Sequence, residues 1–320
     1  MKTTKIIGFA MILTGAFWCV LTAAGAEPST QPAKELNLDL GNKVAMKLVL
    51  IPSGKFTMGS PETEKDRSKD EVQHEVTISK AFFMGVTHVT VDQFAAFVKD
   101  SGYKTDIEKD GVGSGLEVKD GTLVTKKMDG CSWRNPGFEQ KSDHPVVQVT
   151  WNDAKAFCDW LSKKSGKAVQ LPTESRWEYA CRAGTKTAYP WGDEPDKGKG
   201  WANCADQSLK KKESKAPAAW PFFSWDDGFV FTAPVGSFKA NAFGLYDMIG
   251  NAGQWCQDRY VDYEKGAATA PVEADTGTKR VLRGGSWGTF PKLCRSASRY
   301  GTGPDWRGGS IGFRVSVDLK

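Results

Sequence analysis

The residues most able to carry out chemistry lie near the C-terminus, in the segment RVLRGGSWGTFPKLCRSASRY at positions 280–300. This segment holds one cysteine, Cys294, among arginines and glycines. Thiolates select copper(I), and two of them can hold that ion in a linear geometry. The segment is therefore a redox site, the remnant of one, or part of the core of a folded domain.

The arginines and the tryptophan of the same segment allow a second kind of chemistry. Arg283, Trp287, Arg295 and Arg299 would suit an anionic or aromatic ligand if they line a cleft, because guanidinium groups stack on rings and pair with anions. The alternative is structural, with the guanidinium groups bonded to loop carbonyls. Cys294 has a similar alternative as a small buried residue at the start of a core strand.

Few long elements are available to position these residues. The sequence has 34 glycines, 12 tryptophans and little sustained periodicity, which predicts a loop-rich fold with many turns and large buried rings. Strands are predicted on both sides of a turn at residues 52–54, within residues 74–90, and in the alternating C-terminal segment GFRVSV. Residues 99–138 are predicted to form a long surface excursion.

Three short amphipathic helices are predicted from capping residues and apolar faces. Their expected N-caps are Thr90, Asn152 and Thr173, and their expected C-terminal glycines are Gly102, Gly166 and Gly184. The apolar faces of the second and third helices include Cys158 and Cys181, which should therefore point inward.

Residues 1–26 are predicted to be a cleaved signal peptide, because Lys2 and Lys5 precede an apolar run that ends in small residues. An uncleaved membrane anchor is the alternative. The polar, proline-containing residues 27–43 are predicted to be a linker, and residues 44–320 a single domain. After cleavage the protein would be periplasmic or secreted, would have no membrane contact, and could form disulfides.

The net charge argues against nucleic acid as a partner. The formal charge is +5, and it falls to +3 when Lys2 and Lys5 are removed with the signal peptide. Such a small and evenly spread charge is not typical of nucleic-acid binding. The one dense basic run, LKKKESK, lies among Ala, Pro and Ser and is interpreted as a solvated loop.

Five segments in order, LPTESRWEYACRAG, YPWGD, FGLYDMIGNAGQW, RVLRGGSW and GFRV, resemble the sulfatase-modifying-factor, or formylglycine-generating-enzyme, family. The resemblance extends from about Val49 to Val317. It implies an α+β fold, the formylglycine-generating-enzyme-like fold, which is an elaborated C-type-lectin-like fold with little regular secondary structure. Because this fold carries several functions, membership alone does not settle activity.

The resemblance also implies two structural calcium ions. The ligands of the first would be the side chains of Asn203 and Asp227 and the backbone carbonyls of Cys204 and Phe229. The ligands of the second would be the side chains of Asp247 and Gln254 and the backbone carbonyls of Gly250 and Ala252. The family usually has Glu where this chain has Gln254, so the second site should bind calcium more weakly. The alternative is that Asp227 and Asp247 are turn residues beside glycine.

In catalytic members of the family, two cysteines after the Gly-Gly-Ser motif bind copper(I) and use oxygen to convert a substrate cysteine to formylglycine. Counted from Ser286, these positions are Thr289 and Cys294 here. Counted backward from RSASR, Cys294 falls outside the catalytic register.

The resemblance also bears on the disulfides. In the best-known catalytic relatives, cysteines at the positions of Cys158 and Cys181 are bonded to partners that correspond here to Val315 and Ser296. Both cysteines are therefore expected to be free buried thiols or to be paired otherwise.

Two functions remain open. The first is a copper-dependent formylglycine-generating oxidase that acts on exported sulfatases, with Cys294 as its one catalytic cysteine. The second, which we favour, is a calcium-stabilised exported domain that lacks this mechanism and binds a protein, peptide or glycan, or matures a substrate by another route. Thr289 weighs against the first function because it removes one of the two thiolates.

Overall fold

The computed structural model describes residues 1, 34–111, 113–263, 268–269 and 277–319. The chain divides into two units, Met1–Pro32 and Ala33–Lys320, and all the elements below belong to the second unit. The predicted signal peptide lies outside the described residues, apart from Met1. In the described part of the chain, no helix has the length and apolar character needed to cross a membrane.

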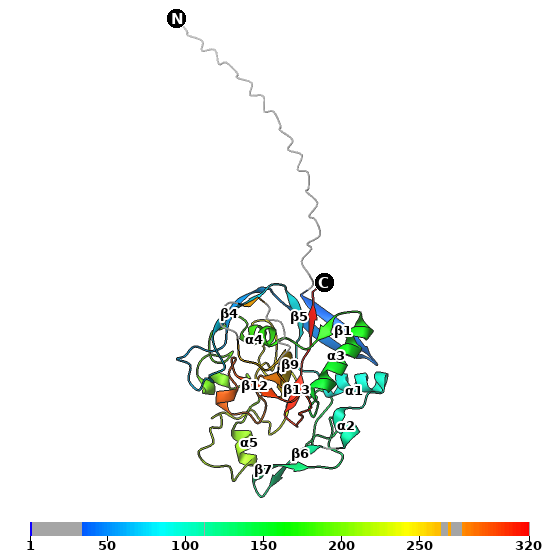
Figure 1. Ribbon diagram of the computed structural model, residues 1–320. Helices are drawn as coiled ribbons and strands as arrows, with labels where there is room; N and C mark the ends of the chain where they lie inside the picture. The colour runs from blue at the N-terminus through cyan, green and yellow to red at the C-terminus, as the bar shows by residue number, and fades with distance from the viewer. Residues whose placement is uncertain (2–33, 112, 264–267, 270–276, 320) are drawn as a thin grey trace. The chain divides into compact units, whose positions relative to one another are not determined.

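A five-stranded sheet joins the two ends of the folded unit. Its order is β1 (Glu35–Gly41), β2 (Val44–Ile51), β5 (Phe82–Gly85), β14 (Ser316–Asp318) and β8 (Val169–Gln170), with every neighbouring pair antiparallel. In Figure 1 the blue N-terminal strands therefore lie beside the red C-terminal strand.

The first strand corrects the predicted linker at 27–43. β1 occupies residues 35–41 and pairs with β2, so the folded domain begins before residue 44. The physical reason is the alternation of Leu36, Leu38 and Leu40, of which Leu38 and Leu40 are buried in the core.

Three helices follow the capping chemistry that the sequence indicated, with two corrections. They are α1 (Val91–Ser101), α3 (Trp151–Ser165) and α4 (Glu174–Arg182), capped by Thr90, Thr150 and Thr173. The predicted cap Asn152 is wrong, because the N-cap is Thr150, two residues earlier, which forms a capping box with Asp153. The residue that ends α4 in a left-handed conformation is Ala183, at φ 44°, rather than Gly184.

The elements outside the two larger sheets and the three capped helices are short. They are β3 (Gly54–Met58), β4 (His74–Ile78), β10 (Ala268–Thr269), α2 (Asp106–Asp110), β6 (Ser114–Lys119), β7 (Thr122–Lys127), α5 (Gln207–Lys212) and the 3₁₀ turns at Pro195–Gly198 and Pro291–Leu293. The predicted strands around the turn at 52–54 and within 74–90 are confirmed. The excursion at 99–138 contains α2 and the β6–β7 hairpin.

A second sheet holds both ends of the segment at residues 280–300. Its order is β12 (Arg299–Thr302), β11 (Arg280–Arg283), β9 (Gly253–Arg259) and β13 (Ile311–Phe313). The predicted single terminal strand GFRVSV is wrong, because β13 ends at Phe313 and β14 begins at Ser316 in the other sheet. The buried guanidinium of Arg314 lies at this break.

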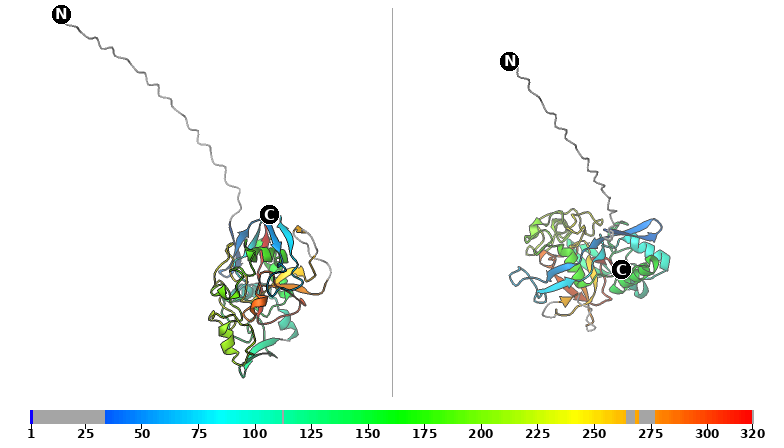
Figure 2. Two further views of the ribbon diagram at one scale, coloured as in Figure 1. Left: turned by 90° about the vertical axis from the view of Figure 1, so that its left-hand side faces the viewer. Right: turned by 90° about the horizontal axis from the view of Figure 1, so that it is seen from above.

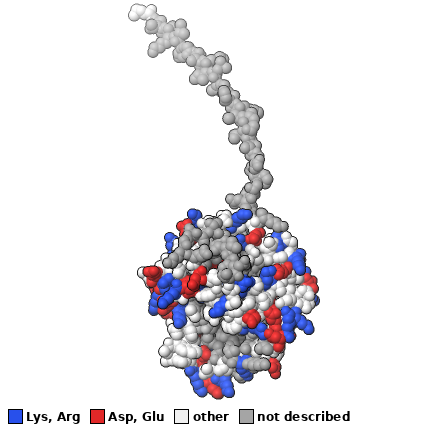
Figure 3. All heavy atoms as spheres, viewed as in Figure 1, with Lys and Arg blue, Asp and Glu red and all other residues white. Residues whose placement is uncertain are grey.

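The two halves of the folded unit differ in their content of regular structure. Seen from above (Figure 2, right), the cyan and green helices gather on one side, and the yellow-green loops of the middle of the chain gather on the other. One apolar core lies among the five-stranded sheet, α1 and α3, and a second lies around α4 and the second sheet. On the face shown in Figure 3, basic and acidic side chains are interspersed.

Candidate functional site

A cavity of about 180 Å³ opens over the second sheet, at the Gly-Gly-Ser turn that follows β11. Gly284, Gly285, Ser286 and Thr289 line one part of it. At its rim, Leu293 is 50% exposed, Tyr300 57% and Trp306 46%. The Tyr300 and Trp306 rings lie 6.2 Å apart. The cavity therefore combines an apolar, aromatic rim with hydroxyl groups inside.

The turn requires its glycines. Gly284 and Gly285 have φ values of 89° and 66°, which favour glycine. A Cβ on Gly284 would lie 2.6 Å from the Met248 carbonyl oxygen. The turn is closed by Thr289, whose Oγ1 accepts a hydrogen bond from the Ser286 amide at 2.9 Å and lies 3.0 Å from Ser286 Oγ. The hydroxyls of Ser286 and Thr289 are thereby held together at the cavity.

The predicted catalytic residue Cys294 occupies a different position. It is fully buried, and its Sγ lies 3.3 Å from the Thr289 carbonyl oxygen and 3.5 Å from Cys204 Sγ. It does not belong to the residues that line the cavity among those the structure describes. The structure thus brings Thr289 to the cavity and places Cys294 beneath it.

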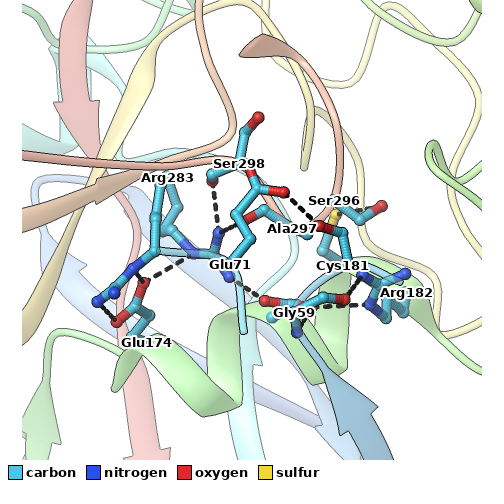
Figure 4. Close-up of polar contacts among 12 residues, drawn as sticks. Gly59, Glu71, Glu174, Cys181, Arg182, Arg283, Ser296, Ala297 and Ser298 are labelled. Atoms are coloured by element: carbon cyan, nitrogen blue, oxygen red, sulfur yellow. Dashed lines mark hydrogen bonds and ion pairs between the residues drawn. The ribbon is translucent and has the colours of Figure 1, made fainter. Parts of the chain in front are cut away.

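Arg283 and Arg299 line the cavity, as the sequence suggested, but their guanidinium groups are bound to carboxylates. Arg283, fully buried, pairs with Glu178 and, at 3.4 Å, with Glu174, and it donates to the Ala297 carbonyl at 2.8 Å (Figure 4). Burial by itself would lower the pKa of Arg283, but nearby Tyr263, Glu178 and Glu174 raise it above the ordinary value. The charge of Arg283 is therefore turned away from any ligand and toward the protein.

The other arginines of the predicted cleft behave in the same way. Arg299 forms a two-bond pair with Glu174, at 2.9 and 2.7 Å, and Arg295 pairs with Glu71 at 2.6 Å and with Glu64 at 2.5 Å. Trp287 is also buried, and its indole N–H donates to the Gly309 carbonyl at 3.0 Å. The structural alternative stated for these residues describes them better than a ligand-binding role.

The first predicted calcium group fits a cation. Asn203 is fully buried, and its Oδ1 has no hydrogen-bond partner among the described residues. Nearby, Asp227 accepts hydrogen bonds from the amides of Phe229 and Cys204, at 2.8 and 3.3 Å. Burial, to which Asp206 adds, raises the pKa of Asp227 to about 8. A buried amide oxygen without a hydrogen-bond partner, beside a buried carboxylate, offers the kind of oxygen ligands that calcium binds.

The second predicted group fits less well. Asp247 Oδ1 is buried without a partner, and burial raises the pKa of Asp247 to about 6. Gln254 Oε1, however, already accepts hydrogen bonds from Trp177 at 2.7 Å and Arg314 at 2.6 Å. The Ala252 carbonyl lies 2.7 Å from His88 Nε2. Two of the four expected oxygen ligands are therefore engaged by protein donors.

Both groups depend on amide and carbonyl oxygens. In the described part of the chain, His, Cys, Asp and Glu form no cluster of three or more that could hold a metal ion. Gly250, a residue of the second group, packs on the first, since a Cβ on it would lie 2.2 Å from the Asn203 carbonyl oxygen. The two groups therefore adjoin each other.

The described cysteines are all buried and unbonded. Cys158 and Cys181 lie on the buried faces of α3 and α4, as predicted. Cys181 Sγ lies 3.9 Å from Ser296 Oγ. Ser296 stands at the position where the family resemblance places the disulfide partner of Cys181.

Sequence reasoning missed the rim of the cavity. Tyr300 and Trp306 were not singled out, because no motif marks an exposed aromatic residue as functional. The exposure of Tyr300 beside the buried Arg299 in β12 is a property of the folded chain, which the sequence does not show. Large exposed rings of this kind are common at binding sites.

Comparisons with known proteins agree with this arrangement. The model of the sulfatase-modifying factor enzyme 1-like domain matches residues 38–319. The formylglycine-generating enzyme of Streptomyces coelicolor is 33% identical over 92% of this chain and 94% of its own length. The inactive C-alpha-formylglycine-generating enzyme 2 of Bos taurus is 32% identical over 87% of this chain and 90% of its own length. The structure of PvdO from Pseudomonas aeruginosa superposes with a TM-score of 0.69 and 29% identity, over 90% of this chain and all of that one.

Proposed function

The chain belongs to the sulfatase-modifying-factor (formylglycine-generating-enzyme) family, and from this premise we propose that it is an exported member that works without the copper-dependent cysteine-pair oxidation. It would act as a calcium-stabilised domain that binds a protein or peptide, or matures one by another route. The observation that carries this proposal is the cavity, which presents Ser286 and Thr289 while Cys294 lies buried beneath it.

Sequence identity does not distinguish the two functions. The chain is 33% identical to a formylglycine-generating enzyme and 32% identical to a relative named as inactive. The decision therefore rests on the site. Copper(I) held by two thiolates needs both sulfurs at the place where the substrate thiol arrives, and Thr289 provides a hydroxyl there.

The exposed side chains of the cavity support a peptide or protein as the partner. Its exposed residues Leu293, Tyr300 and Trp306 offer rings and an aliphatic side chain to an apolar residue of a partner. The family acts on sulfatases, which are proteins. A glycan is the alternative ligand, because exposed aromatic rings also stack on sugar faces.

Calcium would stabilise the loops below the cavity. Asn203 and Asp227, with the carbonyls of Cys204 and Phe229, would hold the first ion. When bound, calcium supplies the positive charge that keeps the Asp227 carboxylate ionised in its buried place. Asp247 and Gly250 remain candidates for a weaker second ion, which would have to displace donors from Gln254 and Ala252.

The catalytic question is tested with a cysteine-containing sulfatase peptide, copper(I), oxygen and the purified mature protein. We expect no conversion of the peptide thiol to an aldehyde by mass spectrometry, while the Streptomyces coelicolor enzyme converts it under the same conditions. Aldehyde formation that Cys294→Ala abolishes would establish the copper-dependent oxidase instead.

The binding role is tested with a random peptide library displayed on phage and with a glycan array. We expect peptide binding that the double variant Tyr300→Ala/Trp306→Ala removes. The matched control is Trp220→Ala, because Trp220 is 39% exposed and lies outside the cavity lining. Binding of glycans alone, or binding that the control variant removes equally, would contradict a peptide site in this cavity.

A further inference from the structure

Two cysteines that are far apart in sequence lie in contact beneath the cavity. Cys204 Sγ and Cys294 Sγ are 3.5 Å apart, although 90 positions separate the residues. Both are fully buried. Cys294 directly follows the 3₁₀ turn Pro291–Leu293, and Cys204 follows Asn203 of the first predicted calcium group. The contact therefore joins the segment that lines the cavity to a loop elsewhere in the fold.

The backbone around these sulfurs leaves room for both of them. A Cβ on Gly285 would lie 3.2 Å from Cys294 Sγ, and a Cβ on Gly250 would lie 2.9 Å from Cys204 Sγ. A residue larger than glycine at position 285 or 250 would therefore crowd one of the two sulfurs.

Other buried cysteines have different neighbours. Cys181 Sγ faces the Ser296 hydroxyl at 3.9 Å, and Cys256 Sγ faces the Gln254 carbonyl at 4.0 Å. Of the cysteines that the structure describes, only Cys204 and Cys294 have a recorded contact between their sulfurs. A disulfide that forms without rearrangement of the fold would therefore join these two.

We propose that Cys204 and Cys294 form a disulfide when the protein folds under oxidising conditions. In the first step, the thiolate of one cysteine attacks a small disulfide such as oxidised glutathione, which forms a mixed disulfide and releases one glutathione thiolate. In the second step, the other cysteine displaces the second glutathione. In total, two protein thiols lose two protons and two electrons, and one oxidised glutathione becomes two reduced glutathiones.

The bond would change how the cavity is held. It closes a chain segment of about 90 residues, which restricts the unfolded chain strongly. It also ties the cavity-lining residues Thr289 and Leu293, which lie just before Cys294, to the loop that carries Asn203. The bond would occupy the Cys294 thiol, so it is compatible with a binding domain or a maturation factor and incompatible with an oxidase that uses Cys294 as a copper ligand.

The experiment is refolding of the reduced chain in buffers with different ratios of reduced to oxidised glutathione. Acid quenching, alkylation of free thiols in denaturant and peptide mapping then identify the bonded residues. We expect the six cysteines described here to fall to four free thiols, with a peptide that links Cys204 to Cys294 and has lost two hydrogens. The linked peptide should disappear when reduced glutathione is in large excess.

Two variants complete the test. Cys294→Ser should keep all its remaining thiols free, whereas the matched control Cys181→Ser should still lose two. If the wild-type protein, folded in the most oxidising buffer, keeps all six thiols or links other cysteines, the proposal is wrong. Because the wild-type peptide map gives this result by itself, the test does not depend on the folding of either variant.

Discussion

Two regions of the molecule are built on different physical principles. The helix–sheet region consists of the five-stranded sheet with α1 and α3, and its interior is apolar. The arginine–carboxylate network lies behind the cavity and buries charged groups. Its members are Arg182, Arg283, Arg295 and Arg299, with Glu64, Glu71, Glu174 and Glu178.

The difference shows how loops can be made rigid without long helices. In the helix–sheet region, caps and side-chain periodicity act over three or four residues. In the network, Arg283 meets Glu178 across 105 positions and Arg295 meets Glu71 across 224 positions. Each such pair joins two segments that are distant in the sequence: Arg283 of β11 meets Glu178 of α4, and Arg295 meets Glu71 between loops. The cost is that a single lost partner leaves a charge buried without compensation.

The largest expected effect is the loss of Arg283. Arg283→Met keeps much of the side-chain length but removes the ion pairs with Glu178 and Glu174, which keep only Arg182 and Arg299 as charged partners. We expect the free energy of unfolding to fall by about 3–5 kcal/mol, because removing one partner of a buried ion pair is strongly destabilising. Denaturation by guanidinium chloride measures this loss.

Arg134→Met is the matched control for that substitution. Arg134 pairs with Glu108 near the surface, where half of its side chain is exposed. Its loss should cost less than about 1 kcal/mol. Equal losses in the two variants would remove the distinction between a buried network and ordinary surface pairs.

Calcium would be a further means of holding the loop-rich half, next to the network. If it binds, saturating calcium at about 100 times the Kd raises the free energy of unfolding by about 2.7 kcal/mol relative to protein in chelator. Asp227→Asn should lose most of this increase, whereas Asp247→Asn should keep most of it, since Gln254 and Ala252 are already engaged. A stability that does not respond to chelator contradicts the calcium proposal.

Lowering the pH should have the next largest effect on stability, because it weakens the arginine–carboxylate network. Burial alone would raise the pKa of Glu71, but hydrogen bonds from Arg295 and Ser60 and the charge of Arg295 lower it below the ordinary value of 4.5. A carboxyl with a lowered pKa in the folded state contributes stability above its unfolded pKa, and this is lost as the pH falls through the folded value. The wild-type protein should therefore lose stability as the pH falls below about 4.5.

Glu71→Gln tests this contribution. At pH 7 the variant should be less stable by about 1–3 kcal/mol, because Arg295 loses a charged partner. The difference should narrow as the pH falls, since the wild-type protein then loses the same charge. Asp159→Asn, on the exposed face of α3, should show no such narrowing. A constant difference between pH 7 and pH 3 for Glu71→Gln would show that its ionisation does not stabilise the fold.

The same two regions explain what the sequence could and could not predict. The end of α1 at Gly102 and its N-cap at Thr90 were predicted because both signals lie within a few residues of the helix that they define. The family resemblance predicted the fold, and it placed Thr289 at the position of the first catalytic cysteine; the structure shows that this residue lines the cavity. The partners of Arg283 and Arg295 were not predictable, because no local rule connects residues more than a hundred positions apart. The thiol pair Cys204–Cys294 was missed for the same reason.

The smallest expected effect lies in the helix–sheet region and concerns the cap of α3. Thr150 Oγ1 accepts a hydrogen bond from the Asp153 amide at 3.0 Å, and Asp153 Oδ2 accepts one from the Thr150 amide at 2.9 Å. Thr150→Ala should therefore cost about 1 kcal/mol, measured by urea denaturation. Asn152, the cap expected from the sequence, lies inside the first turn, and Asn152→Ala should change stability by less than about 0.5 kcal/mol. If the two losses were reversed, Asn152 would be the cap in solution. A Thr150→Ala loss as large as that of Arg283→Met would mean that the helix–sheet region depends on single polar contacts as strongly as the network does.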